Sequence, residues 1–135
     1  MKTFLAHDLK IQQILILIFI ATILLGIVIE KDFLFAVVII EFFLIAIFQY
    51  SLNSIKFNDK KFLKTDSRKI YIFLSTYVVI GFLSWILMIL FKVNTESVGI
   101  KNIFELMAVS WIFISPILII QSLMISFFDF KNNSL

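Results

Sequence analysis

The sequence has no cysteine and only one proline, three glycines and one histidine in 135 residues. Without cysteine, disulfides, thiolate nucleophiles, zinc–thiolate sites and iron–sulfur clusters are excluded. His7 stands alone, so the chain cannot supply two histidines to a haem or a multi-histidine metal site. Three glycines are too few for a nucleotide-binding glycine loop or a glycine-packed channel. We therefore expect no metal, no cofactor and no enzymatic activity.

Charged residues are also scarce, at 16% of the chain, whereas 61% of the residues are hydrophobic. Soluble domains are about 45–50% apolar. The charges gather in a few places and leave four long stretches almost without them. This distribution predicts a membrane protein whose apolar surface faces lipid.

The four apolar stretches cover about residues 9–29, 33–52, 70–91 and 103–128. As helices they measure roughly 30–39 Å, against a hydrocarbon core of about 30 Å. The first stretch is long for a secretory signal core and no small-residue cleavage site follows it, so we interpret it as a retained helix. We predict an all-α membrane protein of one domain, residues 1–135, with four transmembrane helices in an antiparallel bundle.

Polar residues before each stretch predict where the helices begin. Asp8 and Asp32 can cap the first two helices, and Asp66 or Ser67 the third. Asn102 stands three residues before Glu105, the capping-box spacing, at the start of the fourth stretch. That stretch is the longest and contains Pro116, so we expect it to tilt, kink or project from the membrane.

The cations predict the orientation of the chain. Placing both termini in the cytoplasm puts nine of the twelve Lys and Arg residues inside. The positive-inside rule then selects an N-in, C-in topology. The bacterial cytoplasmic (inner) membrane is the preferred location, with an organelle membrane as the alternative.

The predicted cytoplasmic loop, residues 53–69, holds half of these cations. It could lie on the inner membrane surface and attract anionic lipid, or act only as a determinant of topology. It is too small for a folded nucleic-acid-binding surface, so no nucleic-acid partner is expected. The candidate lipid contacts are Lys56, Lys60, Lys61, Lys64, Arg68 and Lys69.

Glu41 is the most informative single residue, because it falls near the middle of the second stretch. A carboxylate at bilayer depth is costly unless it is protonated, paired or hydrated. Three interpretations are open: a proton- or cation-coupling site, a polar contact with a partner helix, or a structural hydrogen bond inside the bundle. Gln49 and Asn53 follow on the same side of the helix and form a partly polar arc with it.

The fourth stretch carries small residues at steps of seven, seven and four, so they share one face of a helix. Small residues let helices approach closely inside a membrane. This face predicts helix packing, either within the chain or against another protein. Its members are Ala108, Ser115, Ser122 and Ser126.

Three functions are compatible with these features. The first is a non-enzymatic accessory or structural subunit of a membrane complex, with the lipid bilayer and another membrane protein or a second copy as partners. The second is a small oligomeric transporter or channel for protons or cations that uses Glu41. Small multidrug transporters also have four spans, but their essential glutamate lies in the first span. The third is immunity against a membrane-active toxin, because size, composition and topology resemble those of four-span bacteriocin immunity proteins.

Overall fold

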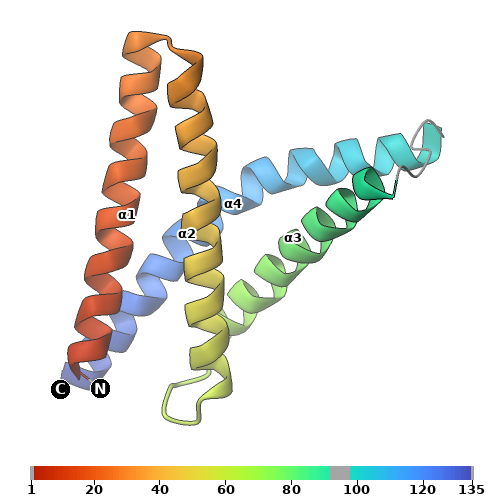
Figure 1. The fold of residues 1–135 in the computed structure, drawn as a ribbon. Helices are drawn as coiled ribbons and strands as arrows, with labels where there is room; N and C mark the ends of the chain where they lie inside the picture. Colours follow the sequence, from red (N-terminus) through yellow and green to blue (C-terminus); the bar gives the residue numbers. More distant parts are fainter. Residues whose placement is uncertain (1, 92–97, 135) are drawn as a thin grey trace.

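The computed structural model describes residues 2–91 and 98–134, which form four α-helices and no strand (Figure 1). The helices are α1 (Lys2–Ile29), α2 (Asp32–Asn58), α3 (Asp66–Leu90) and α4 (Val98–Ser134). Each helix is long and apolar enough to cross a membrane. The prediction of an all-helical chain with four such helices is confirmed.

The helices extend beyond the predicted spans. α2 continues past residue 52 to Asn58, and α3 begins at Asp66, so the loop shrinks from the predicted 53–69 to 59–65. The side chains of Asn53 and Lys56 in the added turns are buried against other helices. Tertiary packing therefore stabilises helical turns that hydropathy excludes from the span.

The predicted cap residues are wrong for all four helices. Asp8 and Asn102 lie inside α1 and α4, because both helices begin several residues earlier. At α2 the N-cap residue is Lys31, whose side chain makes no capping hydrogen bond. Asp32 is the first helical residue, where its charge favours the positive end of the helix dipole.

Thr65, rather than Asp66 or Ser67, caps α3. Its backbone is extended, and its hydroxyl oxygen accepts a hydrogen bond from the backbone N–H of Arg68 at 3.3 Å. Asp66 therefore lies in the first turn of the helix, and its carboxylate accepts from Lys69 one turn later. The cap fixes where α3 begins, and so where Arg68 points.

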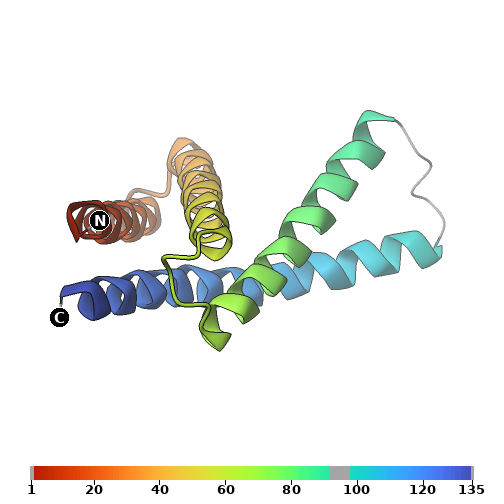
Figure 2. The ribbon, with the colours of Figure 1, turned by 90° about the horizontal axis from the view of Figure 1, so that it is seen from below.

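The helices are arranged as a hairpin and an arm (Figures 1 and 2). α1 and α2 lie side by side, whereas α3 and the first half of α4 diverge from them as an arm. Both termini and the 59–65 loop lie at one end of the hairpin, which we call the charged end. The antiparallel bundle and the N-in, C-in orientation stay predictions.

α4 is 37 residues long, or about 56 Å. Pro116 is its central residue and lies inside the helix. Proline cannot donate the hydrogen bond to the carbonyl of Ile112, and this bends a helix. Figure 1 shows α4 changing direction about midway along its length. The half of α4 after Pro116 follows the hairpin, and the half before Pro116 extends with α3.

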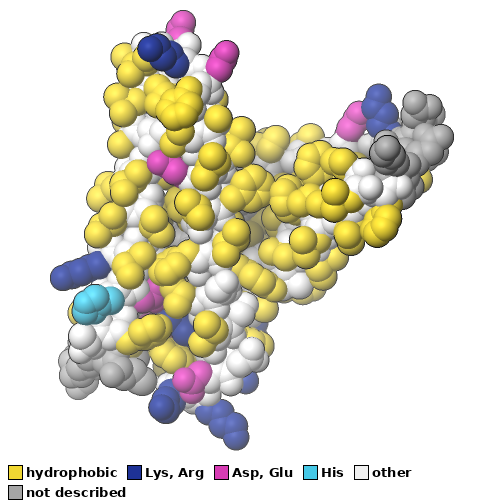
Figure 3. Space-filling model, viewed as in Figure 1, with side chains coloured by type: hydrophobic (Ala, Val, Ile, Leu, Met, Phe, Trp, Pro, Cys, Tyr) yellow, Lys and Arg dark blue, Asp and Glu magenta, His cyan; other side chains and the backbone are white. Residues whose placement is uncertain are grey.

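The interior of the protein is more polar than its surface. Among the described residues, ten buried side chains are polar or charged and six are hydrophobic. Figure 3 shows hydrophobic side chains covering the flanks of the hairpin and arm, and charged side chains gathered mainly at their ends. This is the reverse of a water-soluble protein and suits an environment of lipid.

A row of aromatic rings links the helices away from the charged end. Phe19 of α1 packs on Phe42 of α2, with ring centroids 6.3 Å apart. Phe43 then contacts Phe82 of α3 at 4.9 Å, and Phe82 contacts Trp111 of α4 at 6.5 Å. The Phe43–Phe82 pair therefore connects the hairpin with the arm.

Candidate functional site

A cluster of polar side chains joins all four helices at the charged end, and we call it the polar knot. On α1, α2 and α4 its residues follow one another at steps of three or four, so each helix presents them on one face. The members are Asp8, Gln12, Gln49, Asn53, Lys56, Arg68, Ser122, Ser126 and Asp129.

Two cations and two carboxylates form the charged part of the knot. The ammonium group of Lys56 contacts the carboxylate of Asp8 and lies 3.3 Å from that of Asp129. The guanidinium of Arg68 lies 2.5 Å from the same Asp129 oxygen. The side chains of Lys56, Asp8 and Arg68 are each 1% exposed. Because buried charges are tolerated only when paired, the equal number of each sign stabilises the arrangement.

Gln12 is the hub of the uncharged part. Its amide nitrogen donates to the Asp8 carboxylate at 2.8 Å and to the Ser126 hydroxyl at 2.7 Å. Its amide oxygen accepts from Gln49 at 3.2 Å and from Ser122 at 3.1 Å. A glutamine amide has two donor hydrogens and two acceptor lone pairs. Gln12 therefore uses its full hydrogen-bonding capacity, and three of its four bonds connect α1 with α2 and α4.

Asn53 extends the network by one helical turn. Its amide nitrogen donates to the Ser122 hydroxyl at 2.8 Å and to the backbone carbonyl of Gln49 at 2.9 Å. Gln49 in turn donates to the carbonyl of Ile119 at 3.3 Å. These bonds join α2 to α4 where lipid would provide no hydrophobic force between helices.

The 59–65 loop covers the charged part of the knot. A nitrogen of the Arg68 guanidinium donates to the carbonyl of Leu63 at 2.6 Å. The ring of Phe62 lies 5.8 Å from both the Lys56 ammonium and the Arg68 guanidinium carbon. Both contacts are within cation–π range. The loop is therefore attached to the knot rather than free on the surface.

The predicted polar arc of α2 divides between two places. Gln49 and Asn53 belong to the polar knot, whereas Glu41 lies two turns away at the contact with α1. The Thr22 hydroxyl donates to one Glu41 carboxyl oxygen at 3.0 Å. It also lies 3.0 Å from the carbonyl of Ile18. The other Glu41 oxygen is buried without a hydrogen-bond partner.

The small-residue face of α4 packs within the chain over three of its four predicted positions. Ser115, Ser122 and Ser126 are buried. Ala108 is exposed and is not part of this face. It lies in the half of α4 before Pro116, which has turned away from the hairpin, so the stripe is interrupted by the bend.

The predicted lipid-contact cations also fall into two groups. Lys56 and Arg68 are buried in ion pairs, so the expectation that they face lipid headgroups is corrected. The reason is that Asp8 and Asp129 balance their charge inside the protein. The cations that remain exposed are Lys60, Lys61, Lys64 and Lys69.

Sequence reasoning missed Asp8, Gln12 and Asp129 as parts of one site. Asp8 was expected to cap a helix, and Asp129 falls just beyond the predicted fourth span. The available signal was the spacing of Asp8 to Gln12 and of Ser122, Ser126 and Asp129 on single helix faces. Which faces meet depends on helix packing, and the sequence does not state it.

No family model, curated protein or solved structure matches the chain. Within the described ranges, no three acidic or histidine side chains are grouped to hold a metal ion. Most polar groups of the site are instead directed at one another, and the amide oxygen of Asn53 and the Nε of Arg68 are buried without a hydrogen-bond partner. Chemically, the knot is a neutral hydrogen-bonded clamp, and Glu41 is the carboxyl group with an unused oxygen.

We predict strong coupling between Asp8 and Lys56. Lys56→Met leaves a buried carboxylate uncompensated, and Asp8→Asn weakens the contact to the ammonium. Each change should lower the free energy of unfolding, by about 3–5 kcal/mol for Lys56→Met. The double variant should lose less free energy of unfolding than the sum of the two single losses, by about 0.5–3 kcal/mol.

Unfolding in mixed detergent micelles, followed by circular dichroism, measures these free energies. Lys61→Met removes an exposed cation from the same loop and should change stability by less than about 0.5 kcal/mol. Additive single effects would show that the two side chains do not form the proposed pair.

Proposed function

We propose that the chain is a multi-pass protein of the bacterial cytoplasmic membrane with both termini and the 59–65 loop in the cytoplasm. The support is that these three segments share one end of the hairpin (Figure 1) and that this end carries exposed Lys60, Lys61 and Lys64. The opposite turn has Glu30, Lys31 and Asp32, with little net charge. Lysine-rich segments stay on the cytoplasmic side during insertion.

Because the natural sequence has no cysteine, single cysteines report this topology directly. In intact spheroplasts, Lys61→Cys should react with a membrane-permeant maleimide and not with an impermeant one. Lys31→Cys, at the other end of the hairpin, should react with both. Labelling of position 61 by the impermeant reagent would refute the orientation.

Within this membrane we propose a non-enzymatic accessory or structural subunit of a membrane complex. The polar knot carries the proposal, because its cations, carboxylates and amides are used to hold the four helices together. Arg68 and Lys56 are neutralised by Asp129 and Asp8. Groups engaged in this way act in structure and are not available as nucleophile, acid or base.

The apolar flanks supply the second argument. Large side chains project from the arm without cover from the chain itself: Phe73 of α3 is 75% exposed and Phe113 of α4 is 69% exposed. The backbones of the hairpin and the arm diverge away from the charged end (Figure 1). Exposed apolar surface of this extent suits contact with lipid and with other membrane helices.

The test is whether the chain has a constant partner. The chain is crosslinked in its native cells and purified in mild detergent. The crosslinked product should have an apparent mass well above that of the monomer. Every preparation should contain the same partner protein, or a second copy of the chain, in a fixed ratio. The level of a different partner protein should fall when the chain is depleted. An abundant four-span protein of the same membrane, treated identically, is the control. A monomer without recurrent partner in repeated preparations would refute this function.

A second candidate function is proton or cation transport by an oligomer, and Glu41 favours it. One carboxyl oxygen is held by Thr22 at 3.0 Å, and the other is buried without a partner. An ionisable group at membrane depth marks ion or proton pathways in many transporters. The short Thr22 contact orients the carboxyl group, and the second oxygen is left to accept a proton or a cation.

Glu41→Gln tests this candidate because it keeps the size and hydrogen-bonding ability of the side chain. In liposomes with an imposed proton gradient, the wild-type chain should conduct, and Glu41→Gln should reduce flux to the level of empty liposomes. Glu30→Gln, the same change at the exposed turn, should leave flux unaltered. Absence of wild-type flux, or equal flux in Glu41→Gln, would eliminate transport.

A further inference from the structure

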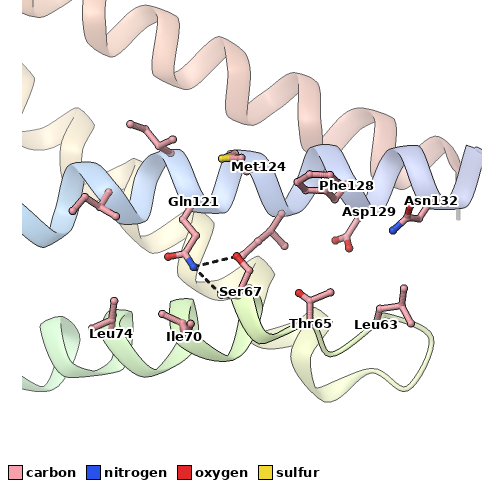
Figure 4. A pocket seen from close by; sticks show the side chains of 13 residues that line it. Leu63, Thr65, Ser67, Ile70, Leu74, Gln121, Met124, Phe128, Asp129 and Asn132 are labelled. Atoms are coloured by element: carbon pink, nitrogen blue, oxygen red, sulfur yellow. Dashed lines mark hydrogen bonds between the residues drawn. The ribbon is translucent and has the colours of Figure 1, made fainter.

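A groove lies between α3 and α4 at the charged end, on the side of α4 that faces the start of α3 (Figure 4). Its volume is about 690 Å³, within the roughly 300–1,000 Å³ typical of small-molecule sites. Gln121 of α4 donates to the backbone carbonyl of Ser67 at 2.8 Å and lies 3.2 Å from its hydroxyl. These contacts hold the two walls of the groove together.

The groove changes from apolar to polar along its length. Ile70 and Leu74 of α3 face Ile117, Ile120 and Met124 of α4 in its apolar part. Figure 4 shows Thr65, Asp129 and Asn132 towards the other end, next to the 59–65 loop. An occupant with a hydrocarbon tail and a polar head matches this gradient.

The apolar part also has the length of one leaflet. On α4 its lining runs from Ile117 to Phe128 and is apolar except for Gln121. These twelve residues are eleven helical steps, or about 16 Å. Half of a hydrocarbon core of about 30 Å is about 15 Å. Water does not fill an apolar groove that opens to the bilayer interior, so the occupant at this depth is an acyl chain.

The charges around the polar end favour an anionic headgroup. Asp129, which lines this end, is paired with Arg68 and Lys56 and so contributes no uncompensated charge. Lys64 lies between Leu63 and Thr65, which both line the groove, and Lys60 and Lys61 precede it in the same loop. All three lysines are exposed. Exposed cations at a membrane surface attract anionic lipid.

We infer that the α3–α4 groove binds one anionic phospholipid of the inner leaflet, with an acyl chain along Ile117–Phe128 and the headgroup beneath the 59–65 loop. The inference rests on the proposed membrane orientation, with the 59–65 loop in the cytoplasm, and is independent of both the subunit and the transport function. It assigns to the loop lysines a specific lipid rather than general attraction to the membrane surface. The groove and the knot share only Asp129, so binding leaves the clamp intact.

Retention of lipid by the purified chain tests the inference. From vesicles of equal phosphatidylglycerol and phosphatidylcholine, the wild-type chain should retain about one phospholipid, mostly phosphatidylglycerol, as measured by native mass spectrometry. Ile120→Trp fills the groove and should reduce the retained lipid about tenfold or more. Ile112→Trp, an exposed position of α4 outside the groove, is the matched control and should retain it.

Two further measurements locate the headgroup and the chain. Replacing Lys60, Lys61 and Lys64 with glutamine should abolish the preference for phosphatidylglycerol while phospholipid is still retained. In the unmodified chain, phosphatidylglycerol with a photoreactive acyl chain should label residues 117–128 and 70–74. This labelling does not depend on whether any variant folds.

Three results would overturn the inference. The first is equal retention of the two phospholipids by the wild-type chain, and the second is unchanged retention by a folded Ile120→Trp variant. The third is labelling spread evenly over the four helices. Labelling confined to the groove, with an excess of phosphatidylglycerol, would support it.

Discussion

The buried ammonium group of Lys56 is the constraint on which the rest of the structure depends. It requires compensation by carboxylates, and those come from two helices, with Asp8 on α1 and Asp129 on α4. Arg68 on α3 then shares Asp129. One charge on α2 therefore determines which faces of three other helices must meet. Removing a single partner would leave a charge unpaired. The ends of the four helices that meet at the charged end are therefore positioned together.

Polar contacts have this importance because helices in lipid gain little from apolar contact with one another. Lipid tails and leucine side chains provide similar surroundings, so hydrogen bonds and close packing decide which helices associate. Gln12 shows this, because three of its four hydrogen bonds run to residues of α2 and α4. Away from the charged end such bonds become fewer, and the hairpin and arm diverge with their apolar flanks uncovered (Figure 3).

The knot, the groove and Glu41 differ in which groups and surfaces they leave available for a ligand or partner. The knot balances two cations with two carboxylates and joins the four helices through hydrogen bonds, so it acts as a clamp. The groove is apolar, open and bordered by exposed lysines, so it suits a lipid. Glu41 has one oxygen held by Thr22 and one without a partner, so it is the described group best placed to accept a proton or cation.

The sequence by itself determined the four helices, because long apolar stretches without charge leave the backbone no other way to satisfy its hydrogen bonds in lipid. It also singled out Glu41, Gln49, Asn53 and the serines of α4. Only the tertiary structure decided that Lys56 and Arg68 are interior, that Ala108 is exposed and that Asp8 meets Lys56. Hydropathy describes a residue's preference for lipid or water. Lys56 follows neither preference, because it is buried inside the protein beside two carboxylates, and its burial depends on partners far away in the chain.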